Sequence, residues 1–316
     1  MNTINESCVY CGIQRKLSDD HIFPQSIGGT YTIRACEKCN NEFGSKFESK
    51  AFDDLKSVLF SFRVCGIKEI WNTRIKQLNV DTIEYSINES FDFIPSKPEF
   101  STNEKGEILF ANGNEKYVKK LLKTETIKNP DAKFECINNT IEFDLSRSWD
   151  VSFDLNTDSL KKMAFKASYA FAKLMKVKLV CENIYDTNNS IMKSLIDTTI
   201  FLPLIIPNII NRRRPLSHIV FIFQEGDSVY GIVELYGVPQ YICKLGAVTE
   251  KMNYALMLEV NPIDKTKNMC SAICMKRGFP IKIVYKPSIQ LHIRNFIKNA
   301  IDRELQNYNK NISKFE

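Results

Sequence analysis

Two cysteine pairs with the same short spacing are the strongest chemical signal in the 316-residue sequence. Cys8 and Cys11 form one C-x-x-C pair, Cys36 and Cys39 form a second, and 24 residues separate the pairs. A C-x-x-C turn points two thiolates at one place, and two such turns supply the tetrahedral four-sulfur shell that structural zinc prefers. We therefore predict one structural Zn²⁺ bound by these cysteines. A segment of about 50 residues can build only a small hydrophobic core, so the free energy of zinc binding would drive its folding.

One of the three histidines in the chain lies between the two cysteine pairs. His21 follows an aspartate pair and precedes strand-forming residues, and the glycine pair at 28–29 favours a turn, so we expect His21 on the first arm of a β-hairpin. After Cys39, phenylalanines at helical spacing predict a helix that begins near Asn40. The predicted order is a hairpin and then a helix, closed over the zinc.

The motifs around these residues resemble those of a known family. The segments CVYCGIQRKLSDDHIFPQSIGG and ACEKCNNEFG resemble the HNH endonucleases of the four-cysteine, zinc-stapled type, and the likeness covers about residues 8–50. The resemblance implies a ββα-metal finger. It also implies hydrolysis of phosphodiester bonds with one divalent ion, Mg²⁺ or Mn²⁺, and one histidine.

The resemblance implies a role for three residues between and after the cysteine pairs. His21 would be the general base that deprotonates the attacking water, a task that suits an imidazole at neutral pH. Asp20 and Asn40 would hold the divalent ion through oxygen, which suits Mg²⁺ because this ion takes one or two carboxylates and keeps several waters. Asn41 is an alternative ligand if the helix begins one residue later.

The sequence departs from the family at two positions. Tyr31 stands where family members often have an asparagine that orients the base histidine, so Tyr31, Thr30 or a backbone carbonyl would have to orient His21. Asn40 stands where many members have a final histidine, and in this respect the chain resembles the HNH domains of RNA-guided nucleases.

The composition places the chain among globular proteins of a reducing compartment. Hydrophobic residues make up 44% and charged residues 25%, which excludes a disordered or fibrous protein. The longest apolar run, 199–210, is too short to span a membrane and contains two prolines, so it is expected in a core. The first residues lack the features of a signal peptide, and we expect a cytoplasmic protein. Six further cysteines are expected to be ordinary buried thiols: Cys65, Cys136, Cys181, Cys243, Cys270 and Cys274.

The positive charge of the chain lies outside the cysteine-containing segment. The formal net charge is +6, yet residues 1–55 contain six Lys and Arg against eight Asp and Glu, which leaves +8 for the remainder. A polyanionic partner would therefore be attracted mainly by residues after 55. The expected partner is nucleic acid, double-stranded DNA in particular, and no membrane.

Two groups of basic residues are candidates for contact with phosphates. A helix is expected from the Thr157 cap to about Val177, and its face opposite the apolar stripe carries four lysines. This face is either a track for phosphates or simply a solvated surface. Three consecutive arginines before Pro215 are the second group, because arginine forks match phosphate oxygens, although a loop cluster that caps carbonyls or pairs with Glu is an alternative. The residues concerned are Lys162, Lys166, Lys173, Lys176, Arg212, Arg213 and Arg214.

The predicted architecture is α+β with two domains. Residues 1–62 form the HNH finger with its structural zinc, and residues 63–316 form a larger mixed domain with antiparallel sheet that recognises the target or regulates the finger. Strand-like segments are expected between about 68 and 154 and between 218 and 285, and a C-terminal helix is expected from 288.

These features predict a metal-dependent HNH endonuclease that hydrolyses DNA phosphodiester bonds, and by analogy a role in restriction or phage defence. The alternative is a zinc-finger protein that binds nucleic acid or regulates without catalysis. The two hypotheses differ in their need for His21. The sequence leaves open whether the substrate is DNA or RNA and whether one strand or both are cut. It also leaves open the sequence specificity and whether the chain forms homo-oligomers.

Overall fold

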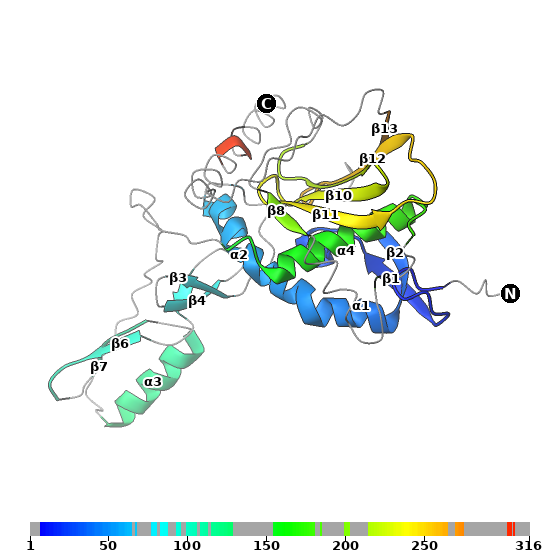
Figure 1. The fold of residues 1–316 in the computed structure, drawn as a ribbon. Helices are drawn as coiled ribbons and strands as arrows, with labels where there is room; N and C mark the ends of the chain where they lie inside the picture. Colours follow the sequence, from blue (N-terminus) through cyan, green and yellow to red (C-terminus); the bar gives the residue numbers. More distant parts are fainter. Residues whose placement is uncertain are drawn as a thin grey trace. The chain divides into compact units, whose positions relative to one another are not determined.

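The structure of the chain is a computed structural model (Figure 1). It describes residues 7–64, 67, 77–80, 83–87, 93–95, 99–105, 108–112, 115–128, 154–180, 184, 199–202, 214–264, 269–274, 302–304 and 306. Helices and antiparallel sheets are mixed along the chain, as the sequence predicts for an α+β fold. No helix in these parts of the chain is long and apolar enough to cross a membrane.

The chain divides into two compact units. One unit combines residues 1–70 with 152–316, and the other consists of residues 71–151. Compactness does not establish which segment folds independently, so the predicted boundary after residue 62 stays a prediction.

The N-terminal finger is a hairpin followed by a helix, which confirms the predicted order. Strand β1 (Leu17–His21) pairs antiparallel with β2 (Thr32–Cys36), so that His21 lies opposite Thr32. The connection contains the 3-10 turn η1 (Gln25–Ile27), which ends at Gly28 with φ 90°, a left-handed conformation that favours glycine. Helix α1 (Glu37–Phe43) begins directly after Cys36.

The finger helix continues well beyond its first turns. A π-helical turn, η2 (Gly44–Glu48), follows α1 and leads into α2 (Ser49–Val64). Gly44 keeps right-handed helical angles, so the helix does not end there. Phe43, Phe47 and Phe52 are buried, because their spacing places them on the face that packs inward.

A six-stranded antiparallel sheet follows in the same unit, with strand order β13-β12-β9-β10-β11-β8. Four of its strands confirm the predicted β pattern after residue 218, whereas β13 was not predicted. The predicted strand near 280–286 and the predicted helix from 288 to 300 lie outside the described residues. The strands are β8 (Ile200–Leu202), β9 (His218–Glu225), β10 (Ser228–Glu234), β11 (Gln240–Ala247), β12 (Tyr254–Val260) and β13 (Met269–Cys274). Cys243 in β11 is buried as predicted, whereas Cys270 in β13 is exposed, so the prediction of burial is wrong for Cys270.

Helix α4 (Asp158–Leu174) lies between the sheet and the finger (Figure 1). Its N-cap is Thr157, as predicted, and the Thr157 hydroxyl accepts a hydrogen bond from the Leu160 amide. On the sheet side α4 approaches so closely that a Cβ added at Gly231 would lie 2.4 Å from Ser168. On the other side it packs against α2 and η2.

The apolar stripe predicted on α4 is confirmed, because Leu160, Met163, Ala164, Ala167 and Phe171 are buried, but the prediction that the opposite face is accessible is wrong at Lys166. Lys166 is fully buried, and so is Tyr169, whereas Leu174 at the end of the helix is 37% exposed. The physical reason is that α4 has packing partners on both sides. A 3.6-residue periodicity identifies one buried face and cannot reveal a second.

The second unit contains short strands and one helix. It has a three-stranded antiparallel sheet, β3-β4-β5, and a two-stranded sheet, β6-β7. Helix α3 is rich in lysine. The bounds are β3 (Gln77–Val80), β4 (Ile83–Ile87), β5 (Phe93–Pro95), β6 (Glu99–Thr102), β7 (Ile108–Asn112) and α3 (Glu115–Lys128).

Candidate zinc and catalytic site

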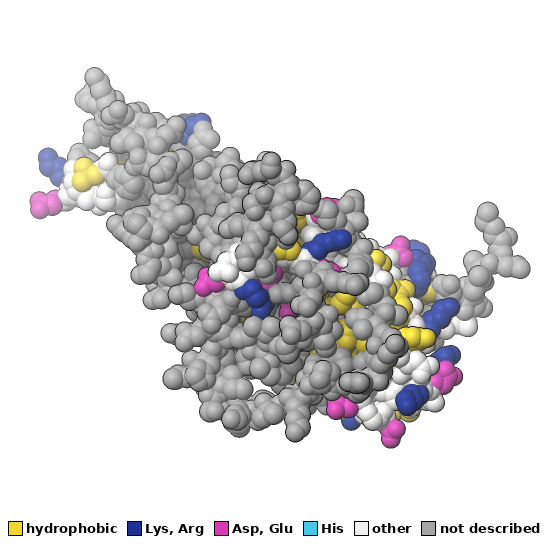
Figure 2. Space-filling view, turned by 90° about the horizontal axis from the view of Figure 1, so that it is seen from above, with side chains coloured by type: hydrophobic (Ala, Val, Ile, Leu, Met, Phe, Trp, Pro, Cys, Tyr) yellow, Lys and Arg dark blue, Asp and Glu magenta, His cyan; other side chains and the backbone are white. Residues whose placement is uncertain are grey.

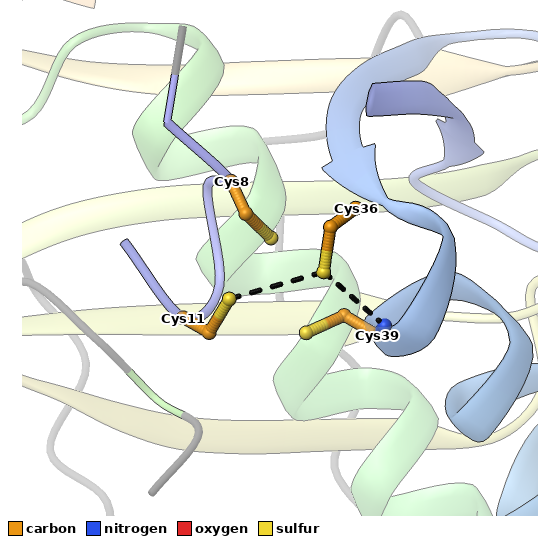
Figure 3. Close-up of side chains that lie close together, drawn as sticks. All are labelled: Cys8, Cys11, Cys36 and Cys39. Atoms are coloured by element: carbon orange, nitrogen blue, oxygen red, sulfur yellow. Dashed lines mark hydrogen bonds between the residues drawn. The ribbon is translucent and has the colours of Figure 1, made fainter. Parts of the chain in front are cut away.

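The four cysteines of the two C-x-x-C pairs converge on one point (Figure 3). All four sulfur atoms lie within 4.8 Å of one another, and the Cys11 and Cys36 sulfurs are 3.9 Å apart. A tetrahedral zinc site with Zn–S bonds of about 2.3 Å has sulfurs about 3.8 Å apart. Cys8, Cys36 and Cys39 are buried and Cys11 is half-buried. The donor set and its spacing therefore fit a structural zinc.

Backbone hydrogen bonds hold the cysteine side chains in this arrangement. The Gly12 amide donates to the Cys8 carbonyl at 2.9 Å, which closes the first turn. Cys36 is the N-cap of α1, and its sulfur accepts the Cys39 amide at 3.5 Å. A hydrogen bond between the Cys8 and Cys39 side chains lowers the pKa of Cys8 to about 4 and raises that of Cys39. The Cys8 thiolate is therefore favoured, and a bound cation would neutralise its charge.

His21 and Asp20 occupy opposite faces of strand β1. Successive side chains of a strand alternate between its faces, and the burial follows this rule: Asp20 is buried, whereas Asp19 is exposed and His21 is half-buried. His21 therefore lies on the accessible face of β1, where its imidazole can meet a substrate. The Tyr31 carbonyl accepts the Ile22 amide at 2.9 Å and so holds the backbone directly after His21.

Both carboxylate oxygens of Asp20 have partners inside the protein. The Tyr10 hydroxyl donates to Oδ2 at 2.5 Å, and the Lys166 ammonium donates to Oδ1 at 2.8 Å. Burial raises the pKa of Tyr10, so the phenol is a neutral donor. Asp20 was predicted as a metal ligand, and a divalent ion would have to share this carboxylate with the two donors or displace one of them.

Asn40 is held against strand β1 by its side-chain nitrogen. The Nδ2 atom donates to the Ser18 hydroxyl and to the Asp19 carbonyl, both at 3.2 Å. Because a carbonyl oxygen can only accept, the nitrogen of the amide must face β1, and Oδ1 must point to the other side. Asn40 is thus fixed against the strand that carries His21, with Oδ1 turned away from that strand. The neighbouring Asn41 is exposed.

The basic residues predicted for phosphate contact separate into distinct groups. Lys166 is fully buried and ion-paired, so the expectation that it lies on a solvent-facing track is wrong. Lys162 and Lys173 are half-buried, and Lys176 is exposed just after α4. On the face drawn in Figure 2, basic and acidic side chains of the described residues are interspersed.

The arginine group is described only at its last member. Arg214 is half-buried, and its backbone amide donates to the Glu259 carboxylate at 2.5 Å. This contact involves only the backbone of Arg214, so both alternatives for the arginine side chains stay predictions. Arg212 and Arg213 lie outside the described residues.

The sequence did not predict the role that three residues have at this site: Tyr10, Glu48 and Lys166. Tyr10 lies inside the first C-x-x-C turn, and its full burial there had no local signal. The contact between Lys166 and Asp20 joins residues 146 positions apart. The one signal for this buried contact is that Lys166 lies on a helix rich in small and apolar residues. That pattern is also typical of a helix with one solvated face.

Comparison with known proteins agrees with this geometry. Residues 8–56 match the family model of HNH endonucleases. No curated protein and no solved structure matches the chain. The matched segment contains the cysteine cluster, the β1–β2 hairpin and the helix that carries Asn40. By this match and this fold, residues 8–56 of the chain are similar to the HNH endonuclease family.

Proposed function

We propose that the chain is a metal-dependent endonuclease that hydrolyses phosphodiester bonds of double-stranded DNA. The observation that carries the proposal is the contact between Asn40 and strand β1. It holds Asn40, our candidate metal ligand, against the strand that carries His21, within a segment that matches HNH endonucleases. The cysteine cluster gives this small site a rigid base through structural zinc.

His21 acts as the general base in this proposal. Its imidazole accepts the proton of a water molecule while the water oxygen attacks phosphorus, and the bond between phosphorus and the leaving oxygen breaks. Asp20 and Asn40 would hold Mg²⁺ or Mn²⁺, which when bound stabilises the charge on the phosphate and the leaving oxygen. A carboxylate has about four lone-pair sites, so Asp20 can serve such an ion while it accepts from Lys166 and Tyr10.

The substrate is held mainly by residues outside the finger. Residues 1–55 have a net charge of −2, which disfavours binding to a polyanion by the finger alone. Lys162, Lys173 and Lys176 lie close together in the sequence at and beyond α4 and are our candidates for phosphate contact. A reducing cytoplasm suits four thiolates that must stay free to bind zinc.

The test is cleavage of supercoiled plasmid with and without Mg²⁺ or Mn²⁺, with wild type beside His21→Ala. We expect cleavage only with metal, and a loss of 10²-fold or more in His21→Ala, about the contribution of a general base. Gln25→Ala, an exposed substitution in the same finger, is the control and should cleave like wild type. Equal zinc content in all three proteins would exclude misfolding. Full activity of His21→Ala would refute the mechanism.

One observation favours a second candidate function. Because Asp20 is buried and already paired, the finger could bind nucleic acid or regulate without holding a catalytic ion. A protein of this kind would need its zinc but not His21, so DNA or RNA binding without turnover would distinguish it. The role in restriction or phage defence stays a prediction, which phage plating on cells with wild type or His21→Ala would check.

A further inference from the structure

We infer that Lys166 is a positioning residue for the catalytic strand of the finger, although it lies far outside the matched HNH segment. Its ammonium binds the strand at Asp20 and at the backbone of His21, and it binds the helix at Glu48. The inference rests on the proposed nuclease function and extends it to helix α4.

The contacts of Lys166 use all the hydrogens of its ammonium. The Nζ atom lies 2.8 Å from Asp20 Oδ1, 2.5 Å from Glu48 Oε1 and 3.0 Å from the carbonyl oxygen of His21. An ammonium has three donors, and here each has an acceptor. The side chain is fully buried, and its nitrogen lies 5.6 Å from the centre of the Phe43 ring.

The three acceptors come from two elements of the finger. Asp20 and His21 end strand β1, whereas Glu48 ends the π-helical turn η2. A single ammonium therefore fixes the end of the strand relative to the helix. One of these hydrogen bonds is to the carbonyl oxygen of His21 itself. It therefore fixes the backbone position from which the imidazole side chain extends.

The energetic cost of this arrangement argues for a role beyond stability. Burial of an ammonium and of carboxylates costs several kcal/mol per ion, and a buried ion pair replaced by apolar residues often leaves stability equal or higher. A methionine would fill the space of Lys166 at less cost. What an apolar side chain cannot do is hold two carboxylates and a carbonyl at defined places.

Helix α4 has a second attachment to the finger that does not involve Lys166. The Thr157 and Ser159 hydroxyls both donate to Asp54 Oδ2, at 2.6 and 2.5 Å. Asp54 belongs to α2, so the N-terminal end of α4 is held to the finger helix independently. A substitution of Lys166 should therefore disturb the strand end while α4 stays in place.

The experiment compares Lys166→Met, Lys166→Arg and the control Lys161→Met, a half-buried lysine on the same helix. We measure kcat and KM for plasmid cleavage, the Mg²⁺ concentration for half-maximal activity, zinc content and the melting temperature. We expect Lys166→Met to lower kcat at least tenfold with little change in KM or zinc. Arginine keeps the charge in a different geometry, so Lys166→Arg should fall between wild type and Lys166→Met. Lys161→Met should match wild type.

A second readout does not need activity. The chain has three histidines, so spectra of histidine-labelled protein are simple to assign. In Lys166→Met the imidazole signals of His21 should shift, while those of His218, which is buried elsewhere, should not. If wild type does not cleave DNA, the nuclease proposal fails, and the His21 signals still decide whether Lys166 positions that residue.

Several results would overturn the inference. Unchanged kcat together with unshifted His21 signals in Lys166→Met would show that the contact is only structural. Higher activity at a lower Mg²⁺ concentration would show that Lys166 competes with the ion for Asp20. If Lys166→Met does not fold, Lys166→Arg decides, because wild-type kcat and unshifted His21 signals in that variant would also overturn it.

Discussion

The Nε2 atom of His218 lies 2.7 Å from the carbonyl oxygen of Ile27, so the first residue of strand β9 is hydrogen-bonded to the finger. Because the carbonyl can only accept, Nε2 carries the proton. The other ring nitrogen, Nδ1, accepts the Tyr236 amide at 3.2 Å. Both nitrogens of a neutral imidazole are thus satisfied in a fully buried position, and a second proton would have no acceptor.

This arrangement predicts that the protein loses stability in mild acid. Burial lowers the pKa of His218 from 6.5 to about 4, so between these values the unfolded chain binds a proton that the folded chain does not. Stability is therefore fully present above about pH 6.5 and falls as pH drops towards 4, by about 3 kcal/mol for this residue. Urea unfolding at pH 7.5 and pH 5 measures the difference. His218→Gln should show a smaller pH dependence, and an unchanged dependence would contradict this assignment.

The contact between His218 and Ile27 also predicts that the stability of the finger depends on the sheet. Gly28 fits so closely that an added Cβ would lie 2.7 Å from Pro262, and Lys166 and His218 supply further contacts from outside the finger. A fragment of residues 1–62 loaded with zinc should melt at a lower temperature than the whole chain, by circular dichroism. A fragment that melts at the same temperature would show that these contacts add no stability to the finger.

Zinc should be required for folding of the finger. Cys36→Ser removes one ligand and the acceptor of the Cys39 amide, so we expect loss of bound zinc and a lower melting temperature. Cys243→Ala is the matched control, because that thiol is buried in the sheet and burial raises its pKa to about 12. Elemental analysis should give about one zinc per chain for wild type and the control. Equal zinc in Cys36→Ser would contradict the four-cysteine site.

Asn40 should govern the affinity for the divalent ion. Loss of its Oδ1 in Asn40→Ala should raise the Mg²⁺ concentration for half-maximal cleavage about tenfold, the size of effect of one ligand group. Lys38→Ala, on the exposed side of α1, is the control. Asn41→Ala tests the alternative ligand, since a larger effect there than in Asn40→Ala would assign the oxygen to Asn41.

The parts of the site that are local in sequence could be predicted, and the parts made by distant contacts could not. The cysteine pairs, the hairpin that carries His21 and the helix that follows the hairpin could be predicted from short-range spacing, because each depends on residues within one turn or hairpin. The helix begins at Glu37, however, and not near Asn40 as predicted. The burial of Lys166 depends on a partner 146 residues away. Its helix has two packing partners, so periodicity indicated a polar face where the structure has a buried ion pair.

The remaining lysines at and beyond α4 test where nucleic acid binds. We expect the combined substitution of Lys162, Lys173 and Lys176 by glutamine to lower DNA affinity equally for all sequences. If all three contact phosphates, the slope of log affinity against log salt should decrease by up to about 3, at about 0.9 per contact. Binding is measured in a His21→Ala background, so that cleavage does not interfere. Lys166 is left intact because it is buried.

A control with the same change of charge separates a specific track from general attraction. Lys46, Lys244 and Lys251 are exposed and distributed over the finger and the sheet, so their combined substitution by glutamine lowers the net charge equally. We expect this control to change the salt slope less than the first variant does. Equal slopes for the first variant and its parent would show that these three lysines form a solvated surface. The arginines at 212–214 would then be the next candidates, because their forks match phosphate oxygens.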